Sequence, residues 1–175
     1  VPLITDSIVL EITSRKVDVA ESYIGFFAKV PISHVPVGET TGIDEPGQLW
    51  DLFHSHKEEI PNLQPDGIEI GVSMIGEAED GTFNYFVGGA MKPNTSTNGD
   101  LTIWELPVDE YMVCSFEAEN FSELTTSALG KAMNYLFGTW LPNRGLTTQP
   151  FSAEKYYKNT PDAAYMEIWV IPIPT

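Results

Sequence analysis

The chain has 175 residues, of which 42% are hydrophobic and 11% aromatic, and this content excludes a disordered protein. Nine Lys and Arg residues stand against 25 Asp and Glu residues, which gives a formal net charge of −16. A surface this acidic repels phosphate backbones and anionic membranes, so we expect neither nucleic acid nor a membrane as a direct partner. The single cysteine, Cys114, excludes an intrachain disulfide, and we expect a cytoplasmic protein.

The first half of the chain reads as strands around one helix. Asp44 suits the N-cap of a helix with Pro46 in its first turn. β-branched and aromatic residues bounded by Gly, Pro and Asp predict the strands. The predicted elements are strands over about 8–30 with a polar break near 15–21, a helix to about residue 59, and strands over 68–75 and 83–91.

The second half follows a polar loop at 92–100, which is the best candidate for an internal boundary. Asn120 can cap a second helix, with Glu123 three residues on as in a capping box. An apolar stripe of Leu129, Met133, Leu136, Phe137 and Trp140 predicts the buried side of this helix. The predicted elements are strands over 101–106 and 111–117, the helix up to a stop at 142–145, and strands over 151–157 and 164–171.

The two halves resemble each other. Each reads strand, helix, strand, strand, and in each a Leu-Phe pair on the helix precedes an apolar-Pro-Asn stop, at 60–62 and at 141–143. We therefore predict one α+β domain over 1–175 with pseudo-repeats at about 1–92 and 101–175. Its two helices would pack on antiparallel sheet, with a ligand cleft between the halves.

The last predicted strand carries the sharpest functional signal. Side chains alternate between the faces of a strand, so Met166, Ile168 and Val170 would pack on a core, and the other face would hold Tyr165, Glu167 and Trp169. A carboxylate between two aromatic rings is costly to bury unless a positive group lies beside it. A cationic ligand would meet that need, and the alternative is an acid that is solvated or paired with Lys or Arg.

Other aromatic residues are candidates for the walls of the same pocket. Trp50 and Trp140 lie near equivalent ends of the two predicted helices, although an aromatic on a helix is more often a core residue than a pocket residue. Tyr85 shares a strand face with Phe83 and Val87. Trp104, on the predicted strand over 101–106, is a further candidate.

Metal and cofactor chemistry find little support in the sequence. His54 and His56 are two residues apart on a predicted helix and so point to different faces, which makes a poor metal pair. No phosphate loop, nucleophile elbow, zinc-protease helix or dinucleotide fingerprint is present. We expect no metal and no cofactor.

The ordered motifs resemble the GyrI-like, or bacterial effector-binding, domain family. The resemblance spans most of the chain, and no single motif in it is diagnostic. Its clearest segments are Tyr111–Val113, Leu136–Gly145, Phe151–Tyr156 and Glu167–Trp169, with Leu49–Phe53 and Ile60-Pro61 in the first half.

The resemblance implies a duplicated strand-helix-strand-strand fold, in agreement with the repeat. It also implies a binder of bulky, often cationic and lipophilic compounds, with the family's central acid falling on Glu167. Because no helix-turn-helix segment is seen, we expect a stand-alone member rather than an intact AraC-type or MerR-type regulator. Some stand-alone members are similar to hydrolases that open strained cyclopropane-type compounds with a Glu and an aromatic residue.

Three functional hypotheses follow. The first is a multidrug-type effector-binding domain for cationic lipophilic molecules, with Glu167 as counter-charge and Tyr165, Trp169, Trp50, Trp140, Tyr85 and Trp104 as ring walls. The second is a hydrolase in which Glu167 is the general base, so the sequence leaves open whether the protein is an enzyme. The third is an acidic module that modulates a regulatory protein partner.

Overall fold

The computed structural model describes residues 2–5, 8–31, 45–64, 67–74, 82–92, 101–158 and 163–175. It divides the chain into two compact units, which we treat separately: unit 1 is Val1–Val19 with Pro107–Thr175, and unit 2 is Ala20–Leu106. The predicted pseudo-repeats, 1–92 and 101–175, follow sequence similarity rather than contacts, and they stay a prediction. Among the described residues, no helix has the length and apolar character needed to span a membrane.

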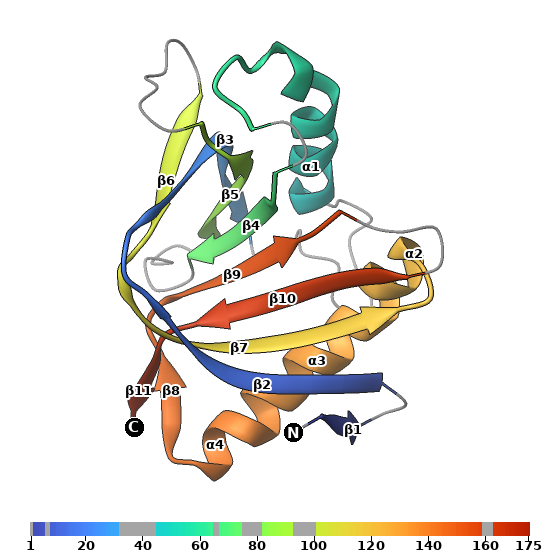
Figure 1. Cartoon of the computed structure of the whole chain (residues 1–175), viewed down its shortest axis with the longest axis vertical. Coiled ribbons are helices and arrows are strands. Elements are labelled where there is room, and N and C mark those ends of the chain that lie inside the picture. The colour runs from blue at the N-terminus through green and yellow to red at the C-terminus, as the bar shows by residue number, and fades with distance from the viewer. Residues whose placement is uncertain are drawn as a thin grey trace. The chain divides into compact units, whose positions relative to one another are not determined.

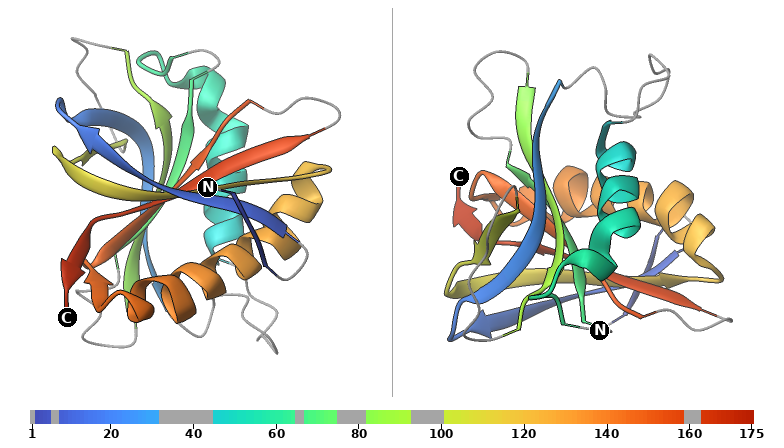
Figure 2. Two further views of the ribbon diagram at one scale, coloured as in Figure 1. Left: turned by 60° about the horizontal axis from the view of Figure 1, so that its bottom comes forward. Right: turned by 90° about the horizontal axis from the view of Figure 1, so that it is seen from above.

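Unit 2 is an antiparallel sheet with one helix on one face (Figure 1). The helix α1 (Glu45–His56) continues into a 3-10 turn, η2 (Lys57–Glu59), and packs on β3 and β5 (Figure 2). Neighbouring strands in the order β4, β5, β3, β6 are all antiparallel. Their bounds are Glu69–Met74 for β4, Thr82–Ala90 for β5, Glu21–Pro31 for β3 and Thr102–Leu106 for β6.

The core of unit 2 explains why α1 forms where it does. Leu49 and Phe53 are four residues apart, so they lie on one helix face and are both buried against the sheet. Pro46 lies in the first turn as predicted, where its missing N–H costs no intrahelical hydrogen bond. The proposed cap, Asp44, lies outside the described residues. The helix ends before Ile60-Pro61 because a residue that precedes proline favours extended backbone.

The main strands of unit 1 are likewise antiparallel, with a long helix on one face. Its strand order is β1 (Leu3–Thr5), β2 (Ile8–Val17), β7 (Asp109–Ala118), β10 (Ala164–Val170) and β9 (Phe151–Tyr156). A separate antiparallel pair joins β8 (Leu146–Thr148) to β11 (Pro172–Pro174). The sequence did not predict β1, β8 and β11, because three residues are too few for an alternation pattern to be recognised.

The helix over 121–143 alternates between α-helical and π-helical turns. Its segments are α2 (Phe121–Glu123), η3 (Leu124–Ala128), α3 (Leu129–Tyr135), η4 (Leu136–Trp140) and α4 (Leu141–Asn143), of which η3 and η4 are π-helical. Asn120 caps it as predicted, because its side chain accepts the Glu123 N–H at 2.8 Å. The helix stops at Gly145, whose φ of 66° is the left-handed conformation that glycine adopts most readily.

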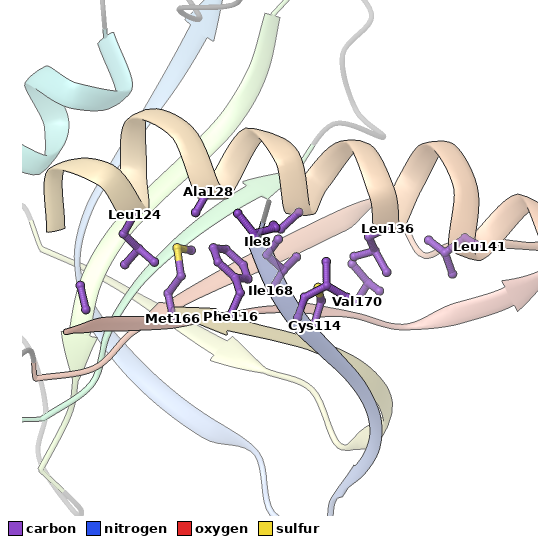
Figure 3. Close-up of a cluster of buried hydrophobic side chains, with 13 residues drawn as sticks. Ile8, Cys114, Phe116, Leu124, Ala128, Leu136, Leu141, Met166, Ile168 and Val170 are labelled. Atoms are coloured by element: carbon purple, nitrogen blue, oxygen red, sulfur yellow. The ribbon is translucent and has the colours of Figure 1, made fainter. Parts of the chain in front are cut away.

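The predicted apolar stripe was partly wrong because the helix contains π turns. The buried helix residues are spaced by four or five rather than by three or four: Leu124, Ala128, Ala132, Leu136 and Leu141 (Figure 3). A π turn contains more residues than an α turn, so this wider spacing remains on one face. Phe137, which belonged to the predicted stripe, is instead 37% exposed.

Both units contain the predicted strand-helix-strand-strand order. In unit 2 it runs β3, α1, β4, β5, and in unit 1 it runs β7, the 121–143 helix, β9, β10. The sheets also share one order, because β4-β5-β3-β6 corresponds to β9-β10-β7-β2. The predicted α+β class, with two helices on antiparallel sheet, is confirmed.

Candidate functional site

The strand β10 presents the two faces that its sequence predicts. Met166, Ile168 and Val170 are fully buried in the cluster beneath the long helix (Figure 3). On the opposite face Tyr165, Glu167 and Trp169 contact one another through hydrogen bonds to the carboxylate. The alternation therefore places one acid and two rings on the helix-free side of this sheet.

The Glu167 carboxylate is only 2% exposed and has four partners, all within unit 1. Its Oε1 accepts hydrogen bonds from the Tyr157 hydroxyl and from the Trp169 indole Nε1 at 3.0 Å. Its Oε2 accepts the Tyr165 hydroxyl at 2.6 Å and lies 3.1 Å from a guanidinium nitrogen of Arg15. These partners occupy about all four acceptor positions of a carboxylate. We call Glu167 with Tyr157, Tyr165, Trp169 and Arg15 the carboxylate cluster.

The cluster keeps the carboxyl ionised. Burial by itself raises the pKa of Glu167, but hydrogen bonds from Tyr157, Tyr165 and Trp169 and the charge of Arg15 outweigh it. The pKa of Glu167 is therefore lowered from its ordinary value of 4.5. This arrangement corresponds to the alternative in which the acid is paired with Lys or Arg. The partner is Arg15.

The two tyrosines of the cluster are held in their neutral, donating form. Burial raises the pKa of both hydroxyls, and the hydrogen bond to the Glu167 carboxylate raises it further. Their rings contact each other at 5.3 Å between centroids. Tyr157 and Tyr165 therefore act as fixed donors to the carboxylate at neutral pH.

Two cations flank the ring of Trp169. The Lys155 ammonium lies 3.6 Å from the ring centroid, and the Arg15 guanidinium carbon lies 5.6 Å from it. Lys155 is itself only 2% exposed and pairs with Glu167 in the register of β9 and β10. The Tyr111 ring contacts the same indole at 5.4 Å. Trp169 is thus held at a site where positive charge meets a ring, which is the geometry of cation–π binding.

In unit 2 the structure brings together two other predicted site residues. The Trp50 indole donates to the Tyr85 hydroxyl at 2.8 Å, from α1 to β5. A Cβ on Gly71 of β4 would lie 2.7 Å from that hydroxyl and 3.1 Å from the Trp50 ring. The glycine therefore leaves the space in which this pair forms.

The remaining two predicted wall residues lie elsewhere. Trp104 contacts Tyr23 and Phe86, on the face of the unit 2 sheet opposite to Tyr85. Trp140 packs against the core beneath the long helix, on the other side of the unit 1 sheet from Glu167, and Arg144 lies 4.1 Å from its ring centroid. Within each unit, the structure does not bring these two tryptophans to the other predicted site residues.

The histidines of α1 do not act as a pair. His54 contacts Glu69 at 2.9 Å, and the same carboxylate receives Lys57 at 3.2 Å, whereas His56 bonds to the Leu52 carbonyl. In the described ranges no three His, Cys, Asp or Glu side chains come together as metal ligands. The Glu69 contacts therefore form a partly exposed ion-pair group.

Sequence reasoning missed three residues around the carboxylate: Arg15, Tyr157 and Lys155. Alternation along 151–157 does place Lys155 and Tyr157 on one strand face, and this signal was available. Arg15 gave no such signal, because β7 separates its strand from β10 and the register of three strands is needed to place it.

Comparison with family models identifies one family. The model of the GyrI-like small molecule binding domain matches residues 36–173. No curated protein matched this sequence. The structure is similar to SAV2435 bound to tetraphenylphosphonium, with a TM-score of 0.66, 15% identity, and coverage of 93% of this chain and 94% of that one.

Two further solved structures support the same fold. The integron cassette protein VCH_CASS2 of Vibrio cholerae has a TM-score of 0.63 and 14% identity, with 94% of this chain and 95% of that chain covered. The C-terminal domain of EcmrR has a TM-score of 0.56 and 13% identity, with 96% and 99% covered. At these identities the likeness establishes the fold alone.

Proposed function

Because the chain belongs to the GyrI-like small-molecule-binding domain family, we propose that its ligands are lipophilic organic cations and that Glu167 supplies the counter-charge. One observation carries the proposal: a carboxylate that is 2% exposed is kept ionised in a cluster of rings. A buried anion of this kind is stable only with positive charge beside it.

The rings around Glu167 support the lipophilic part of the proposal. Tyr157, Tyr165 and Trp169 each direct a polar edge to the carboxylate, so a ligand that reaches Glu167 would meet aromatic rings around it. Trp169 already has two cations over or near its ring. The similar structure of SAV2435 was solved with tetraphenylphosphonium, a cation of the proposed kind.

The same geometry favours binding over hydrolysis at Glu167. A general base needs a free lone pair and a pKa near the working pH. Here all four acceptor positions are occupied and the pKa of Glu167 is lowered, which makes the carboxylate a weak base. The hydrolase hypothesis therefore has less support from this cluster.

The roles of the other aromatic residues stay predictions. We keep Tyr165 and Trp169 as ligand-contacting residues because they touch the carboxylate directly. Trp50, Tyr85, Trp104 and Trp140 are tested one at a time by alanine variants, in which a wall residue would weaken ligand binding without changing the fold.

The test compares two ions of nearly the same size and shape but of opposite charge. Tetraphenylphosphonium and tetraphenylborate are titrated by calorimetry against the wild type and Glu167→Gln. We expect the wild type to bind the phosphonium and not the borate, and Glu167→Gln to bind the phosphonium at least about tenfold more weakly.

The matched control removes one carboxylate from the surface instead. Glu119 is exposed between β7 and α2, so Glu119→Gln changes the net charge equally without touching the cluster. Its phosphonium affinity should equal that of the wild type. Equal affinity of Glu167→Gln and the wild type, with both folded by circular dichroism, would remove Glu167 from the proposed role.

A further inference from the structure

We propose that Arg15 is a built-in competitor for the ligand: its guanidinium occupies the cation position beside Glu167, and a bound cation displaces it. The inference rests on the proposed function and adds to it how affinity and charge selectivity are set. It concerns a residue on β2, a strand that β7 separates from β10 and that lies far from Glu167 along the chain.

The register shows that Arg15 reaches the carboxylate from a distance. Ser115 on β7 pairs with Glu167 on one side and with Glu11 on the other, so Glu11 is the β2 residue in line with the acid. Arg15 instead pairs with Tyr111, four residues along β7. Its side chain therefore crosses β7 diagonally to place a nitrogen 3.1 Å from Glu167 Oε2.

The guanidinium makes both contacts that a ligand cation would need. It has the carboxylate at 3.1 Å and the Trp169 ring at 5.6 Å, within the roughly 6 Å range of a cation–π contact. Arg15 thus satisfies the charge of Glu167 while no ligand is bound. A cation that took the same place would replace these contacts by equivalent ones.

Arg15 is the partner of Glu167 that can leave most easily. Its side chain is 45% exposed, whereas Trp169 is 4% exposed and the two tyrosine rings pack on each other. A guanidinium that swings into water regains hydration and loses a partly screened ion pair. A neutral donor that left the carboxylate would have to break its ring packing as well.

Displacement makes positive charge a requirement for the ligand. A neutral ligand that pushed Arg15 aside would remove the cation that lies 3.1 Å from the buried carboxylate and put no charge in its place, which is unfavourable. A cation restores the balance. Arg15 therefore lowers the affinity for all ligands and lowers it most for uncharged ones.

The first test removes the competitor and uses tetraphenylphosphonium as the probe. Arg15→Met keeps the aliphatic stem but not the charge. We expect it to bind the phosphonium at least fivefold more tightly than the wild type, and Arg15→Met with Glu167→Gln to lose this gain. The matched control is Arg144→Met, because Arg144 is the only other arginine in the sequence and lies over Trp140, with no ion pair to a carboxylate among the described residues. It should bind like the wild type.

The outcomes separate the two proposals. Equal or weaker binding by Arg15→Met, with binding still dependent on Glu167, overturns the competitor and leaves the proposed function intact. Binding of the phosphonium by Arg15→Met but not by the wild type supports the competitor in its strongest form. Absence of binding by both the wild type and Arg15→Met overturns both.

The second test needs no variant of the cluster. Phenylglyoxal modifies exposed guanidinium groups, and mass spectrometry reads Arg15 and Arg144 separately. We expect saturating phosphonium to raise the modification rate of Arg15 severalfold and to leave that of Arg144 unchanged. An unchanged or lowered rate at Arg15, in protein shown to bind the probe, overturns the displacement.

Discussion

In unit 2 the central strands β3 and β5 pair through Gly25 and Gly88, whereas in unit 1 the corresponding strands β7 and β10 pair through Val113 and Trp169. The correspondence follows from a count along the strands, since Tyr23 and Tyr111 are each the third residue of their strand. By the same count, the place of Glu167 in unit 1 is taken in unit 2 by Phe86, which is fully buried.

The difference teaches that the shared strand and helix arrangement does not by itself determine the candidate site. Strand order and helix position are shared by the two units, but β5 carries no charged residue, and its Tyr85 makes a neutral hydrogen bond with Trp50. The buried carboxylate lies in unit 1, on a strand position where unit 2 has the apolar ring of Phe86. The same strand and helix arrangement can thus carry a candidate binding group in one unit and an apolar core residue in the other.

The largest effect that this comparison predicts is the loss of stability on substituting Gly25. Gly25→Val gives β3 the residue that β7 has at the corresponding place, but its Cβ would lie 1.9 Å from the Val87 carbonyl oxygen. The two strands cannot separate without losing their ladder, so we expect a loss of more than about 4 kcal/mol and no folded unit 2. Circular dichroism and soluble yield measure it.

A second glycine provides the control for Gly25→Val. Gly130 lies on the long helix, and an added Cβ there meets nothing within 4 Å. Gly130→Ala should therefore raise the free energy of unfolding by about 0.5–1 kcal/mol. A native-like unfolding transition for Gly25→Val would show that the glycine pair is not what distinguishes the two sheets.

The next prediction concerns how the contribution of Glu167 to the free energy of unfolding depends on pH. The pKa of Glu167 is lower in the folded protein than its ordinary value of 4.5, so its ionisation stabilises the fold above that pH, and the effect is lost as pH falls through the folded value. We expect Glu167→Gln to reduce the free energy of unfolding by about 2–3 kcal/mol at neutral pH, because donors and Arg15 lose a charged partner.

Urea unfolding between about pH 3 and 7 measures the difference in free energy of unfolding between the wild type and Glu167→Gln. The gap between the wild type and Glu167→Gln should be constant down to about pH 5 and then shrink. A gap that widens as the pH falls would mean that the carboxyl is neutral in the folded state, which contradicts the ionised cluster.

The smallest expected effect distinguishes the neutral bond of unit 2 from the charged bonds of unit 1. Tyr85→Phe removes the acceptor of the Trp50 indole and keeps the ring, so we expect a cost of about 1 kcal/mol. Tyr157→Phe removes a donor to a carboxylate, and we expect about twice that cost. Equal costs, measured by urea unfolding at pH 7, would mean that the charge of Glu167 adds nothing to its hydrogen bonds.

Much of the fold was predictable because its signals are local. Alternation along β10 placed Glu167 and Trp169 on one face, and Asn120 and Gly145 marked the two ends of the long helix. Phe137 was misplaced because a stripe drawn for α-helical turns fails where η3 and η4 widen the helix. The sequence offers no local signal for that widening.

The candidate site was predictable only in part, because its remaining members depend on distant registers. Glu167 stands out by itself as an acid in an apolar strand. Arg15 became its partner through the pairing of β2 with β7 and of β7 with β10, and no pattern within β2 predicts this contact. The Trp50–Tyr85 bond likewise depends on Gly71, which is small enough to admit it.

Cys114 can report transient opening of the unit 1 core. Its thiol is fully buried under the 121–143 helix, in the same cluster as Leu136 (Figure 3), and burial raises its pKa to about 12. Alkylating reagents attack the thiolate, so this sulfur can react only when the helix lifts from the sheet. Because the sequence has no second cysteine, the rate of alkylation would count those opening events directly, with no label to install.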